Sequence, residues 1–242
     1  MARKKSWCKP ASTGRQTDRK SLRTYALHPT IIRFSDHLIQ AVLFMKEKQL
    51  LYLGFIGPLL FWATTFFCGL MIDDYNHLSN LVSELGALGS KPQYLFTTGL
   101  VICSVLNIFF VIGLYRICKS QNISTVPVLF LLFFSFLAGP AIVPMPLRLH
   151  GIIGMPFPLM ILSPILALML WRGRKYKVEI GIGASISLLI MLLGFLIFFP
   201  DILSDYFGLK QRFLYLGWTI WSASLAYKFL QLKNKYNESK IN

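Results

Sequence analysis

The chain contains few charged residues for its length, which excludes an ordinary soluble domain. Charged residues make up 14% and hydrophobic residues 55% of its 242 residues, whereas soluble domains carry about 25% charged residues. Its four cysteines form no CxxC pair, so neither a zinc finger nor a disulfide framework is expected. The first 49 residues lack an apolar core followed by a small-residue cleavage site, so a cleaved signal peptide is not expected either.

Two further absences concern transport. Asp, Glu and Lys are nearly missing from the interiors of the long apolar segments, so no proton relay is evident. The two halves of the chain do not repeat one another, as they do in many transporters. A pump or transporter is therefore the least favoured class of function.

What the sequence does contain is a series of long apolar segments. Each is near the ~20 residues that cross a bilayer, and helices are the structure that satisfies a single segment's backbone there. The sequence predicts an all-α integral membrane bundle of six transmembrane helices. The expected spans are Leu50–Ile72, Gln93–Ile117, Thr125–Val143, Gly151–Trp171, Glu179–Phe199 and Phe213–Leu232. Prolines crowd the third and fourth spans, which predicts broken helices there.

Basic residues are concentrated on one side of these predicted spans. Of the 25 Lys and Arg residues, 21 lie in residues 1–49, in the connections 116–124 and 172–178, or at the C-terminal end. This bias predicts cytoplasmic termini. We expect residues 1–49 to be a basic tail that attracts anionic inner-leaflet lipids, with a membrane-surface helix from Thr30 to Gln49. Residues 50–232 form the expected membrane domain and 233–242 a short cytoplasmic tail; nucleic acid is not an expected partner.

One polar stretch, Tyr75–Ser90, interrupts the apolar segments. Read as a short helix, it places three polar side chains on one face; they are His77, Asn80 and Glu84. The charge distribution places this stretch on the non-cytoplasmic face, together with the turns at Leu147–His150 and Pro200–Arg212. We therefore expect a functional site where these three connections meet.

These connections carry side chains that suit several kinds of ligand. His77, His150 and Glu84 could hold a divalent metal ion of unspecified identity, with a position open to water. Arg148 and Arg212 could bind a phosphate or carboxylate group. The residues predicted to bind a ligand are His77, Asn80, Arg148, Gln211 and Arg212.

The same connections offer candidates for catalysis. Glu84 and His150 could act as general acid or base, and Ser83 could act as a nucleophile if a base lies beside it. The alternative is purely structural: Glu84 and Arg212 would form an ion pair that fixes the loop to the last span.

Three elements of the chain resemble the prokaryotic multi-span membrane family called domain of unknown function 998. That family has a Tyr-x-x-x-Ser-x-x-Ile-Ser-Glu-Leu-Gly-Ala stretch, a Phe-Pro-x-Asp element before a His, and a Gly-Leu-x-Gln-Arg element. The matching residues are Tyr75, Ser79, Ser83, Glu84, Leu85, Gly86, Ala87, His150, Gly208, Leu209, Gln211 and Arg212. The chain departs from the pattern at Val143-Pro144-Met145-Pro146, where the acid is missing, so any role of that acid is lost or displaced. The resemblance implies a multi-span protein of a prokaryotic inner membrane.

The Ser-Glu-Leu-Gly element also resembles part of the Frag1/DRAM/Sfk1 six-span membrane proteins, which are linked to lipid handling. Together these features predict a multi-pass membrane protein whose outer-face site recognises a lipid head group or a similar small ligand. One alternative is a membrane-embedded hydrolase or transferase, metal-dependent or not. Another is a non-catalytic sensor, assembly factor or scaffold.

Overall fold

The computed structural model describes residues 45–171 and 180–241, and within them it is all-α without strands. All the described residues belong to one compact unit, 45–242. The predicted basic tail, most of the predicted surface helix and the 172–178 connection therefore lie outside the described residues.

Four helical segments of this unit are long and apolar enough to cross a membrane. They are α2 (Glu47–Leu70), α3 (Gln93–Ser120), Arg148–Leu170 and Gly181–Phe198. The segment Val126–Ile142 is apolar but shorter. The last helix, α9 (Phe207–Ile241), has 35 residues and includes polar residues such as Ser222 and Lys228, which lower its hydropathy. The chain is thus an integral membrane protein with at least these four candidate spans, and the exact number of six is not confirmed.

The proline-rich third and fourth segments are broken, as their sequences predict. The third comprises α4 (Val126–Phe130), a 3-10 helix η2 (Leu131–Leu137) and α5 (Ala138–Ile142). The fourth comprises α6 (Arg148–Gly154), η3 (Phe157–Ile161) and α7 (Leu162–Leu170), and α8 (Gly181–Gly194) then continues into η5 (Phe195–Phe198). Broken helices of this kind expose backbone carbonyls and leave space between neighbours, and the cavities described below lie beside α5 and α6.

An aromatic cluster holds the centre of the bundle together. The Phe134 and Trp218 rings stack with centroids 3.4 Å apart, and Phe61 packs edge-on against Trp218 at 6.0 Å. Tyr215, one turn before Trp218 on α9, contacts Phe61 at 4.6 Å and Phe157 at 5.3 Å. These contacts join α2, η2, η3 and α9 and fix the orientation of the Tyr215 side chain.

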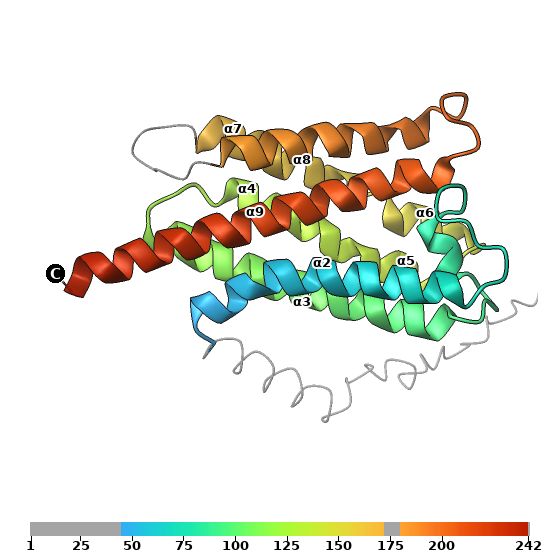
Figure 1. Cartoon of the computed structure of the whole chain (residues 1–242), viewed down its shortest axis with the longest axis horizontal. Helices are drawn as coiled ribbons and strands as arrows, with labels where there is room; N and C mark the ends of the chain where they lie inside the picture. The colour runs from blue at the N-terminus through green and yellow to red at the C-terminus, as the bar shows by residue number, and fades with distance from the viewer. Residues whose placement is uncertain (1–44, 172–179, 242) are drawn as a thin grey trace, which may run out of the picture. The chain divides into compact units, whose positions relative to one another are not determined.

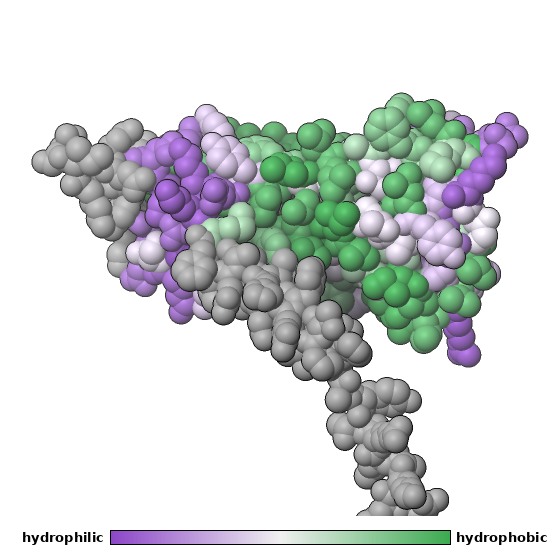
Figure 2. All heavy atoms as spheres, turned by 90° about the horizontal axis from the view of Figure 1, so that it is seen from below, coloured by the Kyte–Doolittle hydropathy of each residue, from purple (hydrophilic) through white to green (hydrophobic). Residues whose placement is uncertain are grey.

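Three connections meet at one end of the bundle, which we call the loop end (Figure 1). The backbone N–H of Leu88 donates to the carbonyl of Met145 at 2.8 Å, which joins the first connection to the second. The N–H of Leu209 donates to the carbonyl of Leu78 at 2.7 Å, which joins the first to the third. In Figure 2, apolar side chains cover the middle of the visible face and hydrophilic ones gather towards its two ends, as in a membrane-spanning bundle.

The predicted helix over Tyr75–Ser90 is wrong in most of its length. Residues 71–80 form turns, and only η1 (Val82–Gly86), a five-residue 3-10 helix, is helical. The physical reason lies in the asparagines. The Asn76 side chain accepts from the N–H of Leu78 at 2.8 Å, and that of Asn80 accepts from the N–H of Asn76 at 2.9 Å. Such bonds offer backbone donors an alternative to an α-helix.

Candidate functional site

The polar stretch is fixed to the start of α9 by Arg212. This side chain is 8% exposed, and its Nη1 donates to the carbonyl of Asn80 at 2.8 Å. Its Nη2 donates to the hydroxyl of Tyr75 at 2.8 Å and contacts Nδ1 of His77 at 3.1 Å. Arg212 therefore holds the loop 75–86, hereafter the docked loop, against the last helix.

The contact with Arg212 determines the protonation of His77. A guanidinium can only donate, so Nδ1 of His77 accepts and its Nε2 carries the proton. Burial and the nearby charge of Arg212 both lower the pKa of His77 below its usual value of 6.5, which favours this neutral form. The ring also stacks on Phe66. In this arrangement neither ring nitrogen of His77 has a free lone pair for a metal ion.

Glu84 caps the helix η1. Its Oε1 accepts from the N–H of Leu81 at 3.1 Å, and its Oε2 accepts from Nδ2 of Asn80 at 2.7 Å. This is one half of a capping box, in which the third residue of the helix reaches back to the N–H of the residue before it; Leu81 has no side-chain acceptor for the other half. The predicted ion pair of Glu84 with Arg212 is not formed: neither ion pair found in the described chain involves Arg212.

The residues before Arg212 complete the docking. The N–H of Gly208 donates to the carbonyl of Ser79 at 3.0 Å, and a Cβ at this position would lie 2.2 Å from the carbonyl oxygen of Asn80. Gln211 accepts from the N–H of Val82 at 2.7 Å through Oε1. The close approach of the two backbones explains why a glycine stands at 208.

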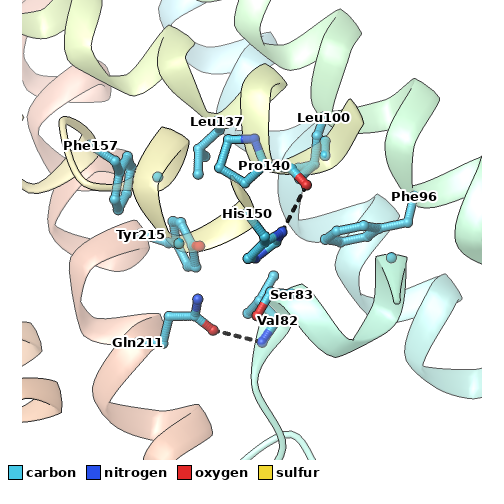
Figure 3. A pocket seen from close by; sticks show the side chains of 14 residues that line it. Val82, Ser83, Phe96, Leu100, Leu137, Pro140, His150, Phe157, Gln211 and Tyr215 are labelled. Atoms are coloured by element: carbon cyan, nitrogen blue, oxygen red, sulfur yellow. Dashed lines mark hydrogen bonds between the residues drawn. The ribbon is translucent and has the colours of Figure 1, made fainter. Parts of the chain in front are cut away.

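Next to the docked loop lies a cavity of about 150 Å³, which we call the polar pocket (Figure 3). Its walls come from η1, α3, η2, α5, α6, η3 and α9. The lining residues are Val82, Ser83, Gly86, Phe96, Leu100, Leu137, Pro140, Ala141, His150, Gly151, Gly154, Phe157, Gln211 and Tyr215. The pocket thus brings together three predicted site residues, Ser83, His150 and Gln211, from three different connections.

His150 is held by the broken end of α5. Its Nδ1 lies 3.0 Å from the carbonyl oxygen of Pro140 and 2.8 Å from that of Val143. Because both partners only accept, Nδ1 must carry the proton. In the neutral ring Nε2 then keeps its lone pair, and within the described residues it has no hydrogen-bond partner. His150 therefore offers the pocket a positioned acceptor of the kind that a general base or a ligand-binding group requires.

Three more polar groups face the pocket around His150 (Figure 3). Within the described residues, neither the Ser83 hydroxyl nor the Tyr215 hydroxyl forms a side-chain hydrogen bond. The amide nitrogen of Gln211 is likewise without a partner there, since only its oxygen is engaged. Sequence reasoning missed Tyr215, although its position four residues after Gln211 places both on one helix face.

The structure does not bring together the three residues predicted to hold a metal ion. His77 and Glu84 belong to the docked loop's contacts, whereas His150 lines the pocket. Among the described residues, no three His, Cys, Asp or Glu side chains lie close enough to hold one ion. Arg148 and Asp205 are exposed at the same end of the bundle, outside the lining of the pocket.

The whole site lies within the part of the chain that matches a known family. The family model described as Protein of unknown function (DUF998) matches residues 55–228. No curated protein and no solved structure matches the chain. The family match covers the docked loop, α6 and the pocket-lining part of α9, and it confirms the resemblance drawn from the three sequence elements. The chain belongs to the DUF998 family, whose function is unknown.

Proposed function

We propose that the polar pocket binds the uncharged glycerol-ester region of a membrane lipid. The observation that carries this proposal is the composition of the pocket: apolar walls surround four unpaired polar groups at one end of a membrane bundle. Ligand sites of this kind combine a mostly apolar lining with a few convergent polar groups that fix the orientation of the ligand. Ester carbonyls and hydroxyls could pair with the hydroxyls of Ser83 and Tyr215, the amide of Gln211 and Nε2 of His150.

The charges around the pocket favour an uncharged group over a phosphate inside it. Among the described residues, no Asp, Glu, Lys or Arg lines the pocket, and burying an unpaired phosphate would carry a large desolvation cost. The guanidinium of Arg212 is occupied by Asn80, Tyr75 and His77. A lipid phosphate would therefore remain in the water layer, where Arg148 is exposed beside His150 and could contact it.

The proposal includes a topology of six spans with both termini in the cytoplasm. The loop end carries only four basic residues, Lys91, Arg148, Lys210 and Arg212, against 21 elsewhere, which supports an outward orientation. A single cysteine at Ser204, with the native cysteines removed, is expected to react with a membrane-impermeant maleimide in intact cells. A cysteine at Ser120 is expected to react only after lysis, and the reverse pattern would contradict this topology.

Replacing His150 with asparagine tests the proposed binding. The amide nitrogen of asparagine can take the place of Nδ1 and donate to the carbonyls of Pro140 and Val143, while the acceptor Nε2 is removed. We expect about tenfold weaker binding of dibutanoyl phosphatidylcholine, a short-chain, water-soluble phospholipid, because one hydrogen bond of ~1.4 kcal/mol is lost. Titration of the purified protein in detergent measures this change.

Asp205→Asn serves as the matched control. Asp205 is exposed at the loop end, so this substitution introduces the same asparagine side chain away from the pocket. Its affinity for the phospholipid should equal that of the unchanged protein. Equal affinities in the unchanged protein and in His150→Asn would contradict the role of His150. A complete lack of binding to all three proteins would favour a non-catalytic scaffold with a purely structural polar cluster.

The pairing of Ser83 with His150 in one pocket favours acyl transfer or hydrolysis as a second candidate function. In that reaction Nε2 of His150 would take the proton of the Ser83 hydroxyl as its oxygen attacks an ester carbonyl. The carbon–oxygen bond to the alcohol of the ester would then break, the alcohol would leave with the proton from Nε2, and water or a second alcohol would release the acyl group from Ser83. A fluorophosphonate that labels Ser83 in the unchanged protein but not in His150→Asn would support it. Lipid binding without labelling of Ser83 would mean that the pocket binds the lipid and does not catalyse this reaction.

A further inference from the structure

A second cavity lies against the polar pocket and is larger. It measures about 230 Å³ and is lined by Gly151, Gly154, Phe157, Gln211 and Tyr215, which also line the polar pocket. Because these five residues border both spaces, the two cavities adjoin, and the wall that they share is formed by these residues. We call the second one the apolar pocket.

The remaining walls of the apolar pocket are hydrophobic. They come from the end of α6, from η3, from η5 and from α9, and consist of Met155, Pro158, Ile197, Phe198 and Leu214. Within the part of the chain that the structure describes, no charged residue lines it. Its contents must therefore be apolar wherever they lie beyond Gln211 and Tyr215.

The size of the polar pocket indicates that a ligand bound there extends beyond it. An apolar cavity of ~150 Å³ holds a molecule of the size of benzene, whereas sites for complete small ligands measure roughly 300–1,000 Å³. A glycerol-ester group would fill the polar pocket, and the chain attached to it needs a separate path. The adjoining apolar pocket provides that path.

The rim of the apolar pocket is formed by exposed apolar side chains. Met155 is 70% and Phe198 57% exposed, and both are apolar side chains on candidate membrane spans. α6 itself buries none of its residues. An apolar occupant could thus enter sideways from the bilayer between α6 and η5 without crossing water.

From these observations we propose that the apolar pocket holds one fatty acyl chain of the lipid whose glycerol-ester group occupies the polar pocket. This inference rests on the proposed function and adds the position and path of the hydrophobic part of the ligand. The carbonyl end of the chain would lie at Gln211 and Tyr215. A cavity of about 230 Å³ encloses only the part of the chain next to the carbonyl, so the rest would pass Ile197 and Phe198 into the bilayer.

Photolabelling tests the inference directly. The full chain is reconstituted into phosphatidylcholine vesicles that contain a phosphatidylcholine with a diazirine on its acyl chain, and adducts are mapped by peptide mass spectrometry. Phe157 and Leu214 are decisive, since they are 6% and 3% exposed and lipid around the bundle cannot reach them. We expect adducts on both residues in the unchanged protein.

Ile197→Trp should reduce these adducts several-fold. Ile197 lines the apolar pocket and not the polar pocket, so the larger tryptophan side chain would occupy space in the apolar pocket alone. Leu189→Trp is the control: Leu189 lies on α8, is 63% exposed and lines neither pocket, so labelling should be unchanged. Dibutanoyl phosphatidylcholine, whose chains are too short to need the apolar pocket, should bind Ile197→Trp as it binds the unchanged protein.

Adducts confined to exposed residues such as Leu189, with none on Phe157 or Leu214, would overturn the acyl-chain inference. The proposed function would survive that result if dibutanoyl phosphatidylcholine still bound. Adducts on Leu214 together with no binding of the short-chain lipid would support the acyl pocket and overturn the proposed polar contacts. The proposed polar contacts and the proposed acyl-chain pocket would therefore be contradicted by different results.

Discussion

Replacing Arg212 with methionine should lower the free energy of unfolding by at least about 3 kcal/mol, since it removes charge-assisted hydrogen bonds worth roughly 1.5–3 kcal/mol each. The change leaves the carbonyl of Asn80 and Nδ1 of His77 without their donor, and methionine keeps most of the side-chain volume. For a domain of this size the expected fall in Tm is about 6–12 °C. Thermal unfolding of the purified protein in detergent measures it.

Arg148→Met provides the comparison, because it removes the same charge from an exposed site at the same end of the bundle. Surface changes of this kind usually stay within about 0.5 kcal/mol. Arg212→Lys should recover only part of the loss, since an ammonium group cannot reproduce the planar set of donors. Equal melting temperatures for Arg212→Met and Arg148→Met would show that Arg212 does not hold the docked loop.

The second large effect is expected from Gly208→Ala. The added Cβ would lie 2.2 Å from the carbonyl oxygen of Asn80 and 2.7 Å from Nη1 of Arg212, and the first of these atoms belongs to backbone that cannot rotate away. The docked loop must shift, which endangers the bond from Gly208 to Ser79. Overpacking of this kind costs roughly 1–3 kcal/mol, and we expect a value near the upper end together with weaker lipid binding.

Gly181→Ala is the matched control. Gly181 begins α8, and a Cβ there would meet no atom within 4 Å. Alanine in a helix is favoured over glycine by roughly 0.5–1 kcal/mol, so this variant should melt at the same temperature or higher. A Gly208→Ala protein as stable as Gly181→Ala would mean that the two backbones do not approach as closely as described.

Much of the arrangement followed from the sequence because membranes restrict the choices. Apolar length predicted where the helices lie, and the prolines predicted that the segments around Pro140 and Pro156 are broken. The order of the spans predicted that the three polar connections emerge together, and the hydrogen bonds from Leu88 to Met145 and from Leu209 to Leu78 join them.

The roles of individual residues were harder to predict, because they depend on local competition for hydrogen bonds. Glu84 and Arg212 have opposite charges on adjoining connections, which suggested an ion pair. Backbone donors at η1 engage Glu84 instead, and backbone and ring acceptors engage Arg212. Sequence spacing could not reveal this, since it depends on the turns that Asn76 and Asn80 impose.

Gln211 and Arg212 also have different roles that their positions in the sequence did not reveal. Both were predicted to bind a ligand, yet adjacent residues on a helix point about 100° apart. Gln211 therefore lines the pocket, while Arg212 is buried against the docked loop. Conversely, His150 of α6 and Ser83 of η1 line one pocket, which no spacing in the sequence encodes.

The most direct test of the proposed lipid site is to measure the ¹⁵N resonance of Nε2 of His150 while the lipid is added. The full chain labelled with ¹⁵N at histidine is titrated with dibutanoyl phosphatidylcholine, and His150→Asn assigns the signal by its disappearance. Binding in the polar pocket predicts that the Nε2 resonance of His150 shifts in a saturable way, while the signals of His77, engaged with Arg212, stay in place. An unchanged His150 resonance at high phospholipid concentration would contradict the lipid site.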